Sequence, residues 1–178
     1  VASDFRMGPM NGRAMTYSWL NAVLEDSSGI DQDSMINGGA SLVYLFGIHH
    51  TYMGIDHPAT YTNFERLPIL FALTPLFCDF GRDSLAMGES WVLEASKGAI
   101  AAVGYSSFAY LTPLGNWGEV FSEAAFRNQY SASLGYYVQA ASDTFVQIWT
   151  DQVYLNHHRC MNILGDPSIH FRSSNFEV

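Results

Sequence analysis

Charged side chains are scarce in this sequence, and positively charged ones are the scarcest. Asp, Glu, Lys and Arg together make up 14% of the 178 residues, and Lys97 is the only lysine. Seventeen acidic residues against 8 basic ones leave a formal net charge of −9. A protein that binds nucleic acid or an anionic membrane surface needs a basic face. The sequence therefore argues against both of these classes of partner.

Long apolar runs and cysteines are scarce as well. No apolar run approaches the roughly 18 residues that a transmembrane helix needs, so we expect no transmembrane span. The 2 cysteines are too few for a disulfide scaffold. Cys78 and Cys160 are either one bridge or two buried thiols, and the sequence leaves this alternative open.

The residues that are plentiful indicate one globular α/β domain over residues 1–178. Hydrophobic residues make up 48% of the chain, which argues against intrinsic disorder, and the length fits a single domain. Three nearly continuous apolar runs, residues 40–46, 67–74 and 98–104, predict strands that are buried on both faces. Such strands form a mostly parallel central sheet that is covered by helices on both faces.

Helical patterns precede, separate and follow these strands. Ser84 as an N-cap, Glu89 in the early turns and Gly98 as a stop predict a helix between the second and third strands. Apolar residues recur at helical spacing within residues 10–24 and 134–149, and residues 25–33 read as a polar loop. In such a sheet, functional groups collect at the carboxyl ends of the strands. Those ends are residues 47–52, 75–81 and 105–117.

Five segments of the chain occur in an order that is typical of one known family. They are INGGASLVYLFG (residues 36–47), LPILFALTPLFCDF (67–80), KGAIAAVGYSS (97–107), NWGE (116–119) and MNILGDPSIHF (161–171). In this order they resemble the gingipain-type cysteine peptidases, whose corresponding first two strands lead into the catalytic histidine and cysteine. The resemblance implies a caspase-like α/β sandwich and the carboxyl-terminal portion of a catalytic domain, without the upstream subdomain.

The catalytic pair of that family is not matched here. In a gapless comparison the histidine position falls on Ile48 and the cysteine position falls on Pro75. Neither residue can act as a base or a nucleophile, and a proline also lacks the N–H that could hold an oxyanion. The resemblance therefore implies a degenerate dyad and an inactive domain. The alternative is an active secreted endopeptidase in which His49 or His50 forms a displaced dyad with Cys78.

Trp117 allows two interpretations. A tryptophan in a chain with 15% aromatic residues is most often part of the core, whereas NWGE resembles the loop whose tryptophan lines the specificity pocket of the family. An intact pocket without a dyad would bind a protein or peptide segment without cutting it.

The family is largely secreted or at the cell envelope, so the resemblance implies an extracytoplasmic location. The missing subdomain predicts exposed apolar surface and a place in a larger protein or assembly.

Metal ions and other cofactors are not expected. Two adjacent histidines on a strand diverge, and no set of ligands suited to zinc is apparent. The histidines are His49, His50, His57, His157, His158 and His170. The acidic loop at residues 25–33 could hold calcium, which is common in proteins of the gingipain type, but it lacks the ligand spacing of an EF-hand. A solvated loop is the default interpretation.

Overall fold

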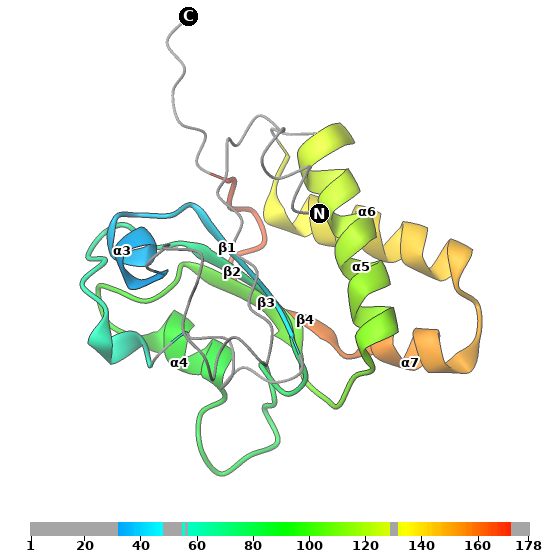
Figure 1. The fold of residues 1–178 in the computed structure, drawn as a ribbon, viewed down its shortest axis with the longest axis horizontal. Helices are drawn as coiled ribbons and strands as arrows, with labels where there is room; N and C mark the ends of the chain where they lie inside the picture. The colour runs from blue at the N-terminus through cyan, green and yellow to red at the C-terminus, as the bar shows by residue number, and fades with distance from the viewer. Residues whose placement is uncertain (1–31, 48–54, 56, 129–131, 172–178) are drawn as a thin grey trace, which may run out of the picture.

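A mixed four-stranded sheet in the order β1-β2-β3-β4 forms the centre of the computed structural model (Figure 1). The structure describes residues 32–47, 55, 57–128 and 132–171. The strands are β1 (Leu42–Phe46), β2 (Ile69–Leu73), β3 (Ala101–Tyr105) and β4 (Met161–Gly165). The first three run parallel, as predicted, and β4 pairs with β3 in the antiparallel direction.

Helices cover both faces of this sheet, which confirms the predicted sandwich (Figure 1). One face carries α5 (Leu111–Glu123), α6 (Leu134–Ile148) and α7 (Gln152–Arg159), and the π-helix η3 (Ala124–Asn128) follows α5. The other face carries α3 (Gln32–Asn37) and α4 (Met87–Leu93), with the 3-10 helix η2 (Pro58–Thr60) in the connection before β2. None of the described helices has the length and apolar character needed to cross a bilayer.

The alternation of side chains along β2 explains why the core has two halves. All five residues of β2 are buried. Phe71 and Leu73 pack toward α5 and α6, whereas Leu70 and Ala72 pack toward α4. A strand that is apolar on both faces must be covered on both faces, so the apolar run itself determines this layered arrangement.

The crossover helix α4 begins later than the sequence predicts. Ser84 is not its N-cap, because the carboxylate of Glu89 accepts a hydrogen bond from the N–H of Ala86 at 2.8 Å and the helix begins at Met87. The helix also ends at Leu93, well before Gly98. The predicted polar loop over residues 25–33 is wrong in its last two residues, because α3 already begins at Gln32.

A buried asparagine and the single lysine fix the turn between α4 and β3. Gly98 has φ +84°, a left-handed conformation that favours glycine. The side chain of Asn63 accepts from the N–H of Gly98 at 3.1 Å and donates to its carbonyl at 2.8 Å. Lys97 Nζ donates to the carbonyl of Ala59 at 2.6 Å and lies 4.0 Å from the carboxylate of Glu94. These bonds connect the turn to η2, and β3 starts only at Ala101.

Candidate functional site

The carboxyl ends of β1, β2 and β3 lie at the same edge of the sheet because these strands are parallel. Ile48, His49 and His50 follow β1 and lie outside the described residues, as do residues 10–24 and 25–31. The geometry of this edge therefore comes from the segments that follow β2 and β3. They contain Pro75, Cys78 and residues 106–110.

Backbone hydrogen bonds tie the segment after β2 to the segment after β3. Leu76 has φ +61°, an uncommon conformation for a residue other than glycine that costs about 1 kcal/mol or more. Its N–H donates to the carbonyl of Ser107 at 3.1 Å, and the N–H of Cys78 donates to the carbonyl of Tyr105 at 2.9 Å. Pro75 is buried and has no N–H. The backbone N–H groups of Leu76 and Cys78 are therefore not free to hold an oxyanion.

The Cys78 thiol is enclosed on every side. Its exposed fraction is 0%, and a Cβ atom built on Gly88 or on Gly104 would come within 2.9 or 3.1 Å of its Sγ. Burial, and next the nearby Glu89 carboxylate, raise the pKa of Cys78 to about 12. Because the thiolate is the nucleophile of cysteine chemistry, this thiol is in its unreactive form at neutral pH. Among the described histidines, none forms a hydrogen bond with it.

Trp117 lies in the core of the α5 face. The resemblance predicts a loop over residues 116–119, and this is wrong because all four residues lie within α5. The indole ring has no exposed surface and stacks on Phe71 with ring centroids 5.8 Å apart. Gly118 lets this helix approach the sheet, since a Cβ atom there would overlap the Tyr44 hydroxyl and a Leu73 methyl group. A pocket wall needs an exposed face, which Trp117 lacks in this structure.

Apolar side chains without cover gather where β1 ends and α5 begins. The exposed fractions are 52% for Phe46, 79% for Phe108, 70% for Tyr110 and 47% for Leu111. The Phe46 ring lies 3.8 Å from the position of a Cβ on Gly115, one turn along α5 from Leu111. We call these four residues the strand-end apolar surface. The apolar stretch at residues 108–111 after the third strand is the sequence signal for this surface, but a sequence alone does not show that these side chains are exposed.

The remaining cysteine and histidines have identifiable surroundings. Cys78 and Cys160 are both free, so of the two alternatives the bridge is wrong. His57 Nδ1 accepts from the N–H of Ala59 at 3.3 Å and caps η2, and the His158 ring stacks on Phe145. Within the described ranges, no three His, Cys, Asp or Glu side chains come together as a metal site would require.

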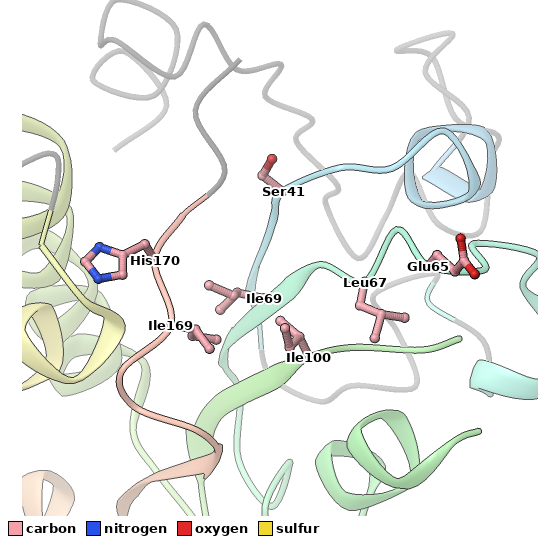
Figure 2. A pocket seen from close by; sticks show the side chains of 7 residues that line it. All are labelled: Ser41, Glu65, Leu67, Ile69, Ile100, Ile169 and His170. Atoms are coloured by element: carbon pink, nitrogen blue, oxygen red, sulfur yellow. The ribbon is translucent and has the colours of Figure 1, made fainter. Parts of the chain in front are cut away.

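A hollow lies at the opposite edge of the sheet, near the amino ends of β1, β2 and β3. Figure 2 shows Ile69, Ile100 and Ile169 between Glu65 and His170. Leu67 and Ser41 complete the lining. Its volume of about 190 Å³ is below the roughly 300 Å³ at which small-molecule pockets begin. It is therefore a shallow apolar depression and not a formed ligand site.

The model of the family described as peptidase family C25 matches residues 19–172. No curated protein matches the chain. Among solved structures, the Arg specific cysteine proteinase gingipain R (RGPB) is similar with a TM-score of 0.70 and 20% sequence identity. The similarity covers 83% of this chain but only 38% of that one.

Two further structures give the same result. One is the complex of Porphyromonas gingivalis RgpB pro- and mature domains, with a TM-score of 0.69 and 18% identity over 79% of this chain and 36% of that one. The other is described only as a protease, with a TM-score of 0.67 and 16% identity over 83% of this chain and 39% of that one. At these identities the likeness establishes a shared fold, and the chain spans less than two fifths of each of these proteins.

Proposed function

The chain belongs to peptidase family C25, and from this premise we propose that it is a gingipain-fold domain that does not cleave peptide bonds. In this proposal it binds a protein or peptide segment outside the cytoplasm. The fold is shared with solved cysteine proteinases, whereas the gapless comparison puts a proline at the nucleophile position. The extracytoplasmic location rests on the family alone.

The single observation that carries the proposal is the environment of Pro75 and Cys78. In the gapless comparison the family's nucleophile position falls on Pro75, which is buried, and the nearby Cys78 thiol is fully buried with a pKa raised to about 12. The N–H groups of Leu76 and Cys78 already donate to backbone carbonyls. A cysteine peptidase needs an accessible thiolate and free N–H donors for the developing oxyanion. Pro75 has no thiol, the Cys78 thiol is buried, and the N–H groups of Leu76 and Cys78 are not available as donors.

A binding role is supported by the strand-end apolar surface. Phe108 and Tyr110 are among the most exposed large hydrophobic residues that the structure describes. Aromatic side chains are enriched in protein interfaces, where they contribute large contact areas. The chain spans 38% of gingipain R, so a larger protein or assembly would supply neighbouring surface. One similar structure is a complex of pro- and mature domains, which is consistent with a protein partner.

Alkylation kinetics test the proposal directly. The variant Cys160→Ala leaves Cys78 as the only thiol, and Cys78→Ala leaves Cys160. We expect iodoacetamide at pH 7 to modify Cys78 in the folded protein two to three orders of magnitude more slowly than free cysteine, because the thiolate fraction falls about tenfold per unit of raised pKa. Cys160 is partly exposed and free, and it serves as the matched control. In denaturant both thiols should react alike.

The opposite result would support the displaced dyad. If Cys78 reacted faster than free cysteine, and if His49→Ala or His50→Ala abolished that excess, Cys78 would be an activated nucleophile. Peptide hydrolysis that disappears in Cys78→Ala would then establish an active endopeptidase. Either finding refutes the inactive domain.

A further inference from the structure

His157 is a buried histidine that the proposed function does not use. It lies in the last turn of α7, and its exposed fraction is 7%. Its ring packs beside Tyr110 at a centroid distance of 5.5 Å and beside Tyr105 at 6.4 Å. The ring therefore sits between the end of β3 and the start of α5.

Both ring nitrogens of His157 are engaged by backbone groups with fixed roles. Nδ1 lies 2.6 Å from the carbonyl oxygen of Val153, which can only accept, so Nδ1 carries the proton. Nε2 lies 2.8 Å from the backbone nitrogen of Tyr110, which can only donate, so Nε2 is unprotonated and accepts. The two bonds together require one neutral tautomer. An imidazolium donates at both nitrogens and cannot keep the bond to Tyr110.

The groups around the ring do not compensate a positive charge. Tyr105 and Tyr110 pack their rings beside it, and within the described residues no carboxylate forms an ion pair with His157. The start of α5 faces the ring, and its first turn contains no acidic residue. The amino end of a helix is the positive end of its dipole and disfavours a cation.

The charges on the surrounding helices are few. On α7 itself the neighbours are His158 and Arg159, and Asp151 caps the far end of the helix. On α6, the carboxylate of Asp143 interacts electrostatically with His158. The carboxyl end of the α7 dipole and the two carboxylates favour a positive charge on His157, whereas Arg159 opposes it. Protonation therefore replaces the two hydrogen bonds of the neutral His157 ring by a buried cation whose Nε2–H faces the backbone N–H of Tyr110.

Protonation removes the hydrogen bond from the Tyr110 N–H to His157 Nε2, and this bond fixes the backbone that carries part of the strand-end apolar surface. Tyr110 is the N-cap residue of α5 and makes no side-chain capping bond. Residues 106–110 connect β3 to α5, and Phe108, Tyr110 and Leu111 are exposed there. Cys160 follows α7, and its carbonyl accepts from the N–H of Ser106 at 2.9 Å, which ties the other end of the same connection. The Tyr110 end depends on His157.

We propose that His157 is an acid-sensitive latch that fixes residues 106–111 when neutral and releases them when protonated. When Nε2 is protonated it can no longer accept from the N–H of Tyr110. The connection between β3 and α5 then loosens and the strand-end apolar surface changes its conformation, while β3 and α7 stay in place.

Amide hydrogen exchange at pH 7 and pH 5, corrected for intrinsic rates, tests the latch. We expect the protection of the Tyr110 amide to fall about five- to tenfold between pH 7 and pH 5 in the wild type, as the loss of one hydrogen bond predicts. His157→Gln retains an acceptor and a donor but does not titrate, so its protection should not change with pH. The matched control His158→Gln changes the neighbouring histidine and should keep the wild-type fall.

Two outcomes would overturn the latch. One is an unchanged Tyr110 protection in the wild type, and the other is an equal fall in His157→Gln. If His157→Gln does not fold, nitrogen chemical shifts of the wild-type ring decide the matter. The latch requires an unprotonated Nε2 at pH 7 and a ring titration with the same midpoint as the Tyr110 protection. A ring that carries its proton on Nε2 at pH 7 refutes it.

Discussion

Gly118 and Tyr44 are fitted to each other across the interface between α5 and the sheet. The hydroxyl of Tyr44 occupies the space in which a Cβ on Gly118 would lie, and a methyl group of Leu73 lies beside it. Burial raises the pKa of Tyr44, and its hydroxyl interacts with Ser122 on the same helix. The helix that carries Trp117 can therefore approach the sheet closely only because residue 118 has no side chain.

Gly118→Ala should destabilise the protein by about 1–3 kcal/mol, because overpacking outweighs the gain in helix propensity. Gly115→Ala in the same helix meets only Phe46 at 3.8 Å and should stabilise by about 0.5–1 kcal/mol. Urea denaturation gives both free energies of unfolding. In a double-mutant cycle, Tyr44→Phe should relieve part of the Gly118→Ala cost. Equal effects of the two glycine variants would contradict the close fit.

Cys78 should make the protein sensitive to alkaline pH. Its pKa rises from 9.0 to about 12 on folding, so the unfolded chain loses this proton first as the pH increases. Stability that is fully present below about pH 9 is then lost toward pH 12, at about 1.4 kcal/mol per pH unit. Between pH 9 and pH 10.5, unfolding free energies of Cys78→Ala should fall less steeply than those of the wild type. Cys160→Ala should keep the wild-type slope.

Asn63 should be essential to the turn before β3. It is 1% exposed and satisfies both backbone groups of Gly98. Asn63→Ala leaves these groups without their partner and should cost about 2–3 kcal/mol in denaturant titrations. Gln139→Ala removes an exposed hydrogen bond to Asp143 and should change stability by less than about 0.5 kcal/mol. A small effect at Asn63 would mean that water replaces its amide.

Phe108 should contribute to binding and not to stability. With 79% of its surface exposed, Phe108→Ser should change the free energy of unfolding by less than about 0.5 kcal/mol. The same change should lower the fluorescence of a hydrophobic dye such as ANS, because the exposed apolar area shrinks. Val153→Ser on α7 removes an exposed side chain outside the strand-end apolar surface and is the control. Dye binding that drops equally in both variants would argue against a distinct surface.

The three parallel strands could be predicted from the sequence because their apolar pattern is local, whereas the antiparallel β4, which is only partly buried, was not predicted. Residues 69–73 are apolar at every position, which predicts a strand covered on both faces, and α6 follows from its helical periodicity. The start of α4 was missed because it depends on a bond between Glu89 and the backbone of Ala86, which shifts the first turn beyond Ser84. Helix boundaries respond to such single contacts, whereas the existence of a helix does not.

The candidate site was less predictable because its character comes from tertiary contacts. The motif around Cys78 gives no sign that Gly88 and Gly104, from α4 and β3, close around the sulfur. Trp117 resembled a pocket residue in sequence, yet the fold places it against Phe71 in the core. The role of His157 depends on the Tyr110 amide, 47 residues away in the chain. A single sequence without its fold does not contain these pairings.

Chemical labelling of Lys97 can report on one contact of the fold, because this residue is the only lysine and its ammonium group is anchored. Since it is the only lysine and its side chain is 17% exposed, acylating reagents meet no other lysine amine in these 178 residues. Its ammonium must leave the Ala59 carbonyl and the face of the Phe64 ring, 5.9 Å away, before it can react. The acylation rate of this residue therefore measures how often the contact between η2 and the turn before β3 opens.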